Sequence, residues 1–139
     1  MLNDKMSVQV EWGDCDPARI VFYPRYFAWV DAAAHHMLAN GGLHQDDLCE
    51  RYNMRGLVLG KVGMEFKTPA HFGEIIEITS SVSRIGGASF DITHEVYRGD
   101  TLILTGEETR IWALENPSKP AGIAAGPIPE EVRAKLEGD

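Results

Sequence analysis

The chain has 139 residues, of which 44% are hydrophobic, and a formal net charge of −8. This length and apolar content predict one globular domain over residues 1–139. The apolar runs are much shorter than the ~18 residues that cross a bilayer, and residues 1–10 are too polar for a signal peptide. We therefore expect a cytoplasmic protein without a membrane partner.

The basic residues are scattered singly along the chain. The 13 Lys and Arg side chains form no run that would neutralise successive phosphates, which argues against a nucleic-acid partner. A few well-placed cations still suffice to hold one anionic ligand. Cys15 and Cys49 lack the number and spacing of a disulfide framework or a metal site. His35 and His36 are adjacent, so they point to different faces of a helix, and no metal is expected.

The first half of the chain predicts one strand and one long helix. Residues 7–12 alternate apolar and polar side chains, as a strand does. Tyr23-Pro24-Arg25 indicates a helix start, because proline has no N–H to lose in the first helical position. The helix is predicted to run to about Asn40 and to stop at Gly41-Gly42. Its apolar residues recur at helical spacing and form a broad face: Tyr26, Phe27, Trp29, Val30, Ala33, Ala34, Met37 and Leu38.

The second half predicts mainly strands. Residues 44–56 are irregular apart from a short helix near 46–51. Alternating segments then begin near residues 62, 76, 90 and 101, and the last of them continues to residue 114. Their short, glycine-containing connections predict a four-stranded antiparallel meander. A short helix near 129–136 is expected to close the chain.

One strand, a buried helix and four further strands give an α+β arrangement in which the sheet wraps the helix. This layout resembles the hotdog fold. Its sheet leaves strand edges open, so we expect a homodimer or a homotetramer.

Residues 11–26, EWGDCDPARIVFYPRY, resemble the signature of the 4-hydroxybenzoyl-CoA thioesterases. In both, a carboxylate precedes a helix-opening Tyr-Pro by seven residues, and the resemblance extends to about Ala113. It implies hydrolysis of an aromatic or short-chain acyl-CoA, with no cofactor besides the coenzyme A of the substrate. It also implies that Asp16 attacks the thioester carbonyl or activates water, while the backbone N–H near Tyr23 binds the carbonyl oxygen.

These roles agree with elementary chemistry, because a helix N-terminus supplies oriented donors, each worth ~3 kcal/mol in a transition state. Asp14 and Asp16 also have a structural interpretation as turn or capping residues. We keep that interpretation for Asp14 and favour catalysis for Asp16. Cys15 lies between these charges, which raise the pKa of a thiol, so we expect it to pack rather than react.

The substrate-binding residues are less clearly marked. Phe22 and Tyr23 are candidates for the lining of an aromatic acyl pocket. Where the resembling enzymes carry basic residues before a Ser-Phe pair, this chain has Arg84-Ile85-Gly86-Gly87-Ala88-Ser89-Phe90. We expect Arg84 to bind a coenzyme A phosphate, with Ser89 and the N–H groups of Gly86 and Gly87 near the pantetheine or pyrophosphate. The alternative phosphate ligands are Arg19, Lys61 and Arg110.

Two other function classes stay open. A hotdog dehydratase or hydratase usually pairs a histidine with a carboxylate on the central helix. A non-catalytic acyl-CoA-binding protein of this fold usually carries a DNA-binding helix-turn-helix, for which the early strand leaves no room. Related Tol-Pal-linked thioesterases have a histidine in place of Pro24, so the resemblance favours the aromatic acyl branch.

Overall fold

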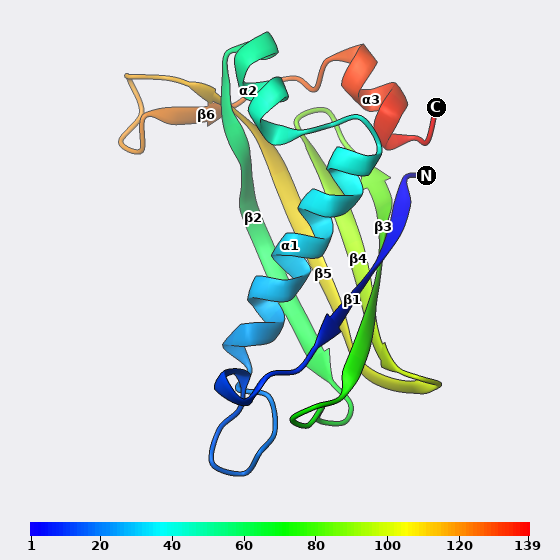
Figure 1. Ribbon diagram of the computed structural model, residues 1–139. Helices are drawn as coiled ribbons and strands as arrows, with labels where there is room; N and C mark the ends of the chain where they lie inside the picture. Colours follow the sequence, from blue (N-terminus) through cyan, green and yellow to red (C-terminus); the bar gives the residue numbers. More distant parts are fainter.

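The computed structural model describes all 139 residues, and Figure 1 shows a curved antiparallel sheet with a long helix along one face. The strands are β1 (Asn3–Gln9), β2 (Met54–Phe66), β3 (Ile75–Ile85), β4 (Ser89–Arg98), β5 (Thr101–Glu115) and β6 (Ile123–Ala125). The helices are α1 (Pro24–Asn40), α2 (Gln45–Tyr52) and α3 (Glu130–Leu136), and a 3₁₀ turn, η1, covers Trp12–Asp14. None of the helices combines the length and apolarity required to span a bilayer. The predicted α+β arrangement is confirmed.

The helix α1 begins and ends where its sequence predicts. Pro24 lies in the first turn, and the N–H of Gly41 donates to the carbonyls of Met37 and Leu38 at the other end. The face toward the sheet buries six side chains: Tyr26, Val30, Ala33, Ala34, Met37 and Leu38. Each large apolar side chain buried in this way contributes about 1.5–3 kcal/mol.

The order of the strands differs from the prediction in one respect. The strand order is β1-β3-β4-β5-β2, with β6 added to β5. The hairpins β3–β4 and β4–β5 were predicted, but β2 pairs with β5 rather than with β3. The predicted four-stranded meander was therefore wrong in its first strand. The connection 67–74 crosses between strands that lie apart in the sheet, and its length alone resembled that of a hairpin loop.

Two strand boundaries also differ. The first strand ends at Gln9 instead of Trp12, because Glu11 and Asp14 form a reciprocal capping box that turns the chain into η1. The strand β2 begins at Met54, inside a segment predicted to be irregular. A register shift near Gly56, which has a φ of +122°, interrupts the alternation there.

The core consists of two apolar clusters. One contains Phe90 and Trp112 and includes residues of α2 and α3, whereas the other contains Tyr26 and Ile78 and includes the first turns of α1. Buried polar side chains occupy the inner face of the sheet where the two clusters would otherwise meet: Ser80, His94, Glu108 and Arg110.

These polar side chains form one hydrogen-bonded chain that reaches α1. Ser80 Oγ lies 2.8 Å from His94 Nδ1, and His94 Nε2 lies 3.3 Å from Glu108 Oε2. Arg110 Nε donates to Glu108 Oε1 at 2.7 Å, and Arg110 Nη2 donates to Asp31 Oδ1 at 2.6 Å. We call Ser80, His94, Glu108, Arg110 and Asp31 the polar belt.

The charge of Glu108 makes part of the folding stability dependent on pH. Burial opposes its ionisation, but the hydrogen bonds from His94 and Arg110 hold the pKa of its carboxyl below the ordinary value. Such a group stabilises the fold fully above its unfolded pKa of about 4.3, and this contribution is lost as the pH falls through the folded pKa.

We expect Glu108→Gln to lower the free energy of unfolding by a constant amount at neutral pH and by less under acid conditions. Urea unfolding at a series of pH values measures this difference, with Glu50→Gln at an exposed position as the control. A difference that grows on acidification would contradict the assignment.

Candidate active site

The acidic segment before α1 folds into a loop that is closed by backbone pairing. Cys15 and Val21 form an isolated antiparallel bridge. The N–H of Phe22 donates to the carbonyl of Asp14 at 2.8 Å, and the N–H of Asp16 donates to the carbonyl of Ile20 at 3.0 Å. We call residues 13–23 the Asp16 loop.

The Asp16 loop is hydrogen-bonded to the connection between β2 and β3. The carbonyl of Ala70 accepts the N–H of Val21 at 3.0 Å, and the N–H of Ala70 donates to the hydroxyl of Tyr26 at 3.1 Å. Ile20 and His71 form a second bridge. The start of α1 and the Asp16 loop are thus held by the same short segment.

Asp16 combines a structural contact with a free carboxylate oxygen. Its Oδ1 accepts the N–H of Ala18 at 2.8 Å, and its carbonyl accepts the N–H of Arg19 at 2.8 Å in a turn that contains Pro17. This is a favoured position for aspartate, one residue before proline. The side chain is only partly buried, and its Oδ2 has no hydrogen-bond partner in the chain. The turn therefore orients the carboxylate and leaves one oxygen available for chemistry.

Asp14 and Cys15 have the structural surroundings expected of them. Asp14 Oδ2 accepts the N–H of Glu11 at 2.9 Å, and Asp14 Oδ1 lies 3.7 Å from Arg25 Nε. Desolvation, followed by the charges of Asp14 and Asp16, raises the pKa of the Cys15 thiol. A raised pKa disfavours the thiolate, so Cys15 is a poor nucleophile.

The start of α1 presents one free backbone donor. Pro24 has no N–H, while the N–H groups of Arg25 and Tyr26 donate to the carbonyls of Phe22 and Tyr23 at 2.9 and 3.1 Å. The N–H of Tyr23 donates to no group in the chain. It lies at the positive end of the dipole of a 17-residue helix. A donor in this position can stabilise negative charge on a carbonyl oxygen.

An apolar cavity of about 310 Å³ has Tyr23 in its lining. It is lined by Ile20, Val21, Tyr23, Tyr26, Phe66, Lys67, Thr68 and Pro69. The rings of Tyr26 and Phe66 lie 5.9 Å apart, and burial raises the pKa of the Tyr26 hydroxyl. Phe22, predicted to line an acyl pocket, is 52% exposed and contacts the ring of Tyr23 at 5.5 Å, outside the cavity. Phe66 was not predicted in this lining, because it enters from β2, far from the Asp16 loop in the sequence.

Arg84 and Ser89 lie at the β3–β4 hairpin, and Figure 1 shows this hairpin and the Asp16 loop at opposite ends of the sheet. Arg84 Nε donates to Asp91 Oδ2 at 2.7 Å, which raises the pKa of Arg84 and lowers that of Asp91. The N–H of Gly86 donates to the carbonyl of Ser89 at 2.7 Å. The hairpin therefore already uses the N–H of Gly86, while the expected contact of Ser89 and the N–H of Gly87 with the pantetheine or pyrophosphate stays a prediction.

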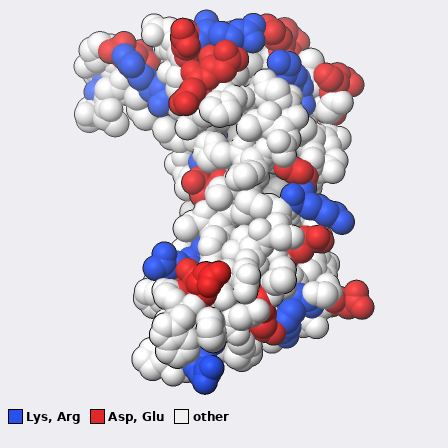
Figure 2. All heavy atoms as spheres, viewed as in Figure 1, with Lys and Arg blue, Asp and Glu red and all other residues white.

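The other basic candidates differ in their availability. Lys61 is 70% exposed and lies 3.4 Å from Glu107 Oε1. Arg110 is buried in the polar belt, and it is not available to a phosphate. Arg19 stacks over the ring of Trp12 at 5.5 Å and has no carboxylate partner. Figure 2 shows no large basic patch on the face that carries α1.

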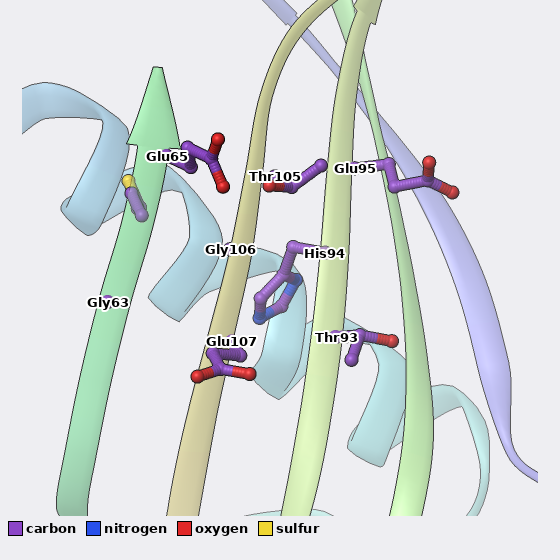
Figure 3. Close-up of a pocket in the computed structure, with 9 residues that line it drawn as sticks. Gly63, Glu65, Thr93, His94, Glu95, Thr105, Gly106 and Glu107 are labelled. Atoms are coloured by element: carbon purple, nitrogen blue, oxygen red, sulfur yellow. The ribbon is translucent and has the colours of Figure 1, made fainter. Parts of the chain in front are cut away.

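A larger hollow of about 600 Å³ lies over three adjacent strands. Figure 3 shows its lining, which comes from β2, β5 and β4. Glu65, Glu95 and Glu107 are exposed around it, and neither Asp16 nor Tyr23 takes part. An acidic hollow without these two groups is unsuited to an anionic thioester.

Comparison with known proteins places this geometry in a family. A sequence model of the thioesterase-like superfamily matches residues 10–136. The 4-hydroxybenzoyl-CoA thioesterase of Pseudomonas sp. strain CBS-3 is 30% identical over 118 residues, which make up 80% of this chain and 83% of that protein. A solved Asp-to-Asn mutant of a 4-hydroxybenzoyl-CoA thioesterase, in complex with 4-hydroxybenzoyl-CoA, has a TM-score of 0.89 at 25% identity and covers 98% of this chain and 99% of its own.

A solved gentisyl-coenzyme A thioesterase has a TM-score of 0.81 at 30% identity, and the match covers 96% of this chain and 99% of that chain. Together these similarities confirm the hotdog fold expected from the sequence. The chain belongs to the thioesterase-like superfamily.

Proposed function

We propose that this protein hydrolyses acyl-CoA thioesters to a free acid and coenzyme A, with Asp16 and the N–H of Tyr23 acting on the thioester carbonyl. The observation that carries the proposal is the pairing of two unsatisfied groups in one loop. Oδ2 of Asp16 and the N–H of Tyr23 have no partner in the chain, and an apolar cavity adjoins Tyr23. Hydrolysis requires such a carboxylate and such a donor.

Two mechanisms use these groups. In one, the carboxylate of Asp16 attacks the carbonyl carbon, the thiolate of coenzyme A leaves, and water then opens the mixed anhydride. In the other, Asp16 takes a proton from a water molecule as the water oxygen attacks the carbonyl carbon, and the tetrahedral intermediate then expels the thiolate of coenzyme A. In both, the N–H of Tyr23 donates to the oxygen on which negative charge develops.

The lining of the cavity supports an aromatic or short acyl group. Tyr23, Tyr26 and Phe66 supply aromatic surface, and aromatic rings favour edge-to-face or offset contact with another ring. The relatives named for 4-hydroxybenzoyl-CoA and gentisyl-coenzyme A are thioesterases of aromatic acyl groups. These names support the same substrate class for this chain.

A second copy of the chain is proposed to complete the site. The strand β2 is at the end of the strand order, so its outer edge is unpaired. Leu59, Val62 and Phe66 on this strand are 39–50% exposed. Antiparallel pairing of the β2 edges of two copies would cover these three side chains. The two copies would then point in opposite directions along the strands. The β3–β4 hairpin of one copy then lies at the same end as the Asp16 loop of the other.

Replacement of Asp16 tests the catalytic assignment. We expect Asp16→Asn to remain folded and to lose roughly a hundredfold or more in kcat, because an amide cannot act as base or nucleophile. Asp14→Asn is the matched control and should lose much less. Thiol release from benzoyl-, hydroxybenzoyl-, phenylacetyl- and short aliphatic CoA esters measures both variants. Equal losses in the two variants, or none in Asp16→Asn, would refute the assignment.

Arg84 is expected to bind a substrate phosphate remote from the reacting carbonyl. Loss of such a contact raises KM and leaves kcat nearly unchanged. Because Asp91 already neutralises much of its charge, we expect Arg84→Ala to raise KM only about tenfold, near the low end for a charge-assisted contact. Asp91→Asn should have the opposite effect on KM.

An acyl-pantetheine thioester without the nucleotide supplies the control substrate. On this substrate, Arg84→Ala and the unmodified enzyme should perform alike. An unchanged KM for the full CoA ester would transfer the phosphate site to Arg19 or Lys61.

The assembly is testable by light scattering, which should give at least a dimeric mass. Val62→Lys places a charge on the free edge of β2 and should shift the protein toward monomer with loss of activity. Ile75→Lys is the control, because Ile75 is 63% exposed but lies on β3, away from this edge. A monomer with full activity at micromolar concentration would remove the idea.

A further inference from the structure

The polar belt joins the sheet to α1 through one buried side chain. Arg110 donates to Glu108 on β5, to the carbonyl of Leu57 on β2 at 3.2 Å, and to Asp31 on α1. The side chain of Arg110 is 5% exposed, whereas that of Asp31 is 53% exposed. This is the only ion pair between α1 and the sheet.

The remaining members of the polar belt hold Glu108 in one orientation. Glu108 uses Oε1 for Arg110 and Oε2 for His94, and His94 uses its other ring nitrogen for Ser80. Gly106 lies opposite His94 in the pairing of β4 with β5, and Figure 3 shows the imidazole between these strands.

Stability alone does not account for the polar belt. It interrupts the apolar core between two clusters, and its members are almost completely buried except for Asp31. Replacing a buried ion pair by apolar residues of similar volume is often neutral or stabilising. A directional contact can instead fix one specific arrangement of the elements that it joins.

The helix α1 needs such a contact because its apolar face is non-directional. Asp31 follows Tyr23 by eight residues, so the two lie on the same side of the helix, with Phe27 between them. The ring of Phe27 contacts that of Tyr23 at 6.5 Å. Movement of α1 along its axis would shift Asp31 and the N–H of Tyr23 together.

We propose that the polar belt is a positioning device: Arg110, oriented by Glu108, holds Asp31 and thereby sets the position of α1 at which the N–H of Tyr23 meets the carbonyl oxygen. This inference rests on the proposed thioester hydrolysis for its kinetic consequence. Ser80, His94 and Glu108 are 2–3% exposed, so they act through Arg110 without touching substrate.

A double-mutant cycle tests this positioning. Glu108→Gln and Asp31→Asn should each lower kcat about ten- to a hundredfold with little change in KM, because small misplacements of reacting groups have effects of this size. The double variant should be no slower than the worse single variant, since both changes break the same chain of contacts. Additive losses, or kcat unchanged in both single variants, would overturn the proposal.

Two further variants separate positioning from folding. Arg110→Met should lower kcat, and Arg110→Lys, which keeps the positive charge, should have a higher kcat than Arg110→Met. We expect this order of kcat even if the melting temperature of Arg110→Met equals or exceeds that of Arg110→Lys. Arg51 of α2 forms a surface ion pair with Glu131 of α3, in which Arg51 Nη2 lies 3.0 Å from Glu131 Oε1. Arg51→Gln breaks this pair and should leave kcat unchanged. If kcat instead follows melting temperature across all these variants, the polar belt is only a stability element and the proposal fails.

Amide hydrogen exchange gives a readout that does not depend on activity. Asp31→Ala, at an exposed position, should accelerate exchange over residues 26–30 of α1 at unchanged global stability. Unaltered exchange there would overturn the positioning role. If the unmodified protein releases no thiol from any CoA ester, yet Asp31→Ala still accelerates exchange, the proposed function is refuted while the polar belt keeps its role in positioning α1.

Discussion

The placement of one helix against the sheet determines everything else in this structure. Six buried side chains of α1 pack on the inner face, and at about 1.5–3 kcal/mol for each large one they outweigh any single hydrogen bond, which contributes about 0.5–1.5 kcal/mol. Apolar packing therefore decides that α1 lies on the sheet. Apolar packing does not fix the position of the helix along its own axis. That position depends on directional contacts: Tyr26 to Ala70 near the start of the helix, Asp31 to Arg110 near its middle, and Asn40 to Asp4 at its end.

The sequence predicted features that depend on local chemistry and missed those that depend on partners. The bounds of α1 followed from Pro24, Gly41 and helical spacing, and the hairpin at Gly86-Gly87 followed from its glycines. The partner of β2 did not follow, because alternation shows which face a side chain occupies and not which strand lies beside it. The Asp16 loop was identified by its motif, but the free Oδ2 became visible only with the contacts of the turn.

The polar belt was missed for a different reason. Glu108, Arg110 and Trp112 lie two positions apart along β5. Strict alternation therefore places all three side chains on the same, inner face of the sheet. Charged residues are rarely buried, and Arg110 was instead considered for phosphate binding at the surface. Its actual partner, Asp31, lies 79 positions away in the chain, beyond the reach of any local pattern.

The distribution of charge explains how an acidic protein can accept an anionic thioester. Most of its basic side chains are committed to carboxylates, as in Arg51 with Glu131, Arg55 with Glu115, and Arg98 with Glu74. Arg19 is different, because it follows Asp16 by three residues and is held over Trp12 without a carboxylate partner. Its backbone is left-handed, with a φ of +67°, which is uncommon for a residue other than glycine. The turn that orients the Asp16 carboxylate therefore also carries a cation that has no carboxylate partner. Local placement of charge, rather than the net charge of −8, governs the potential that a substrate meets there.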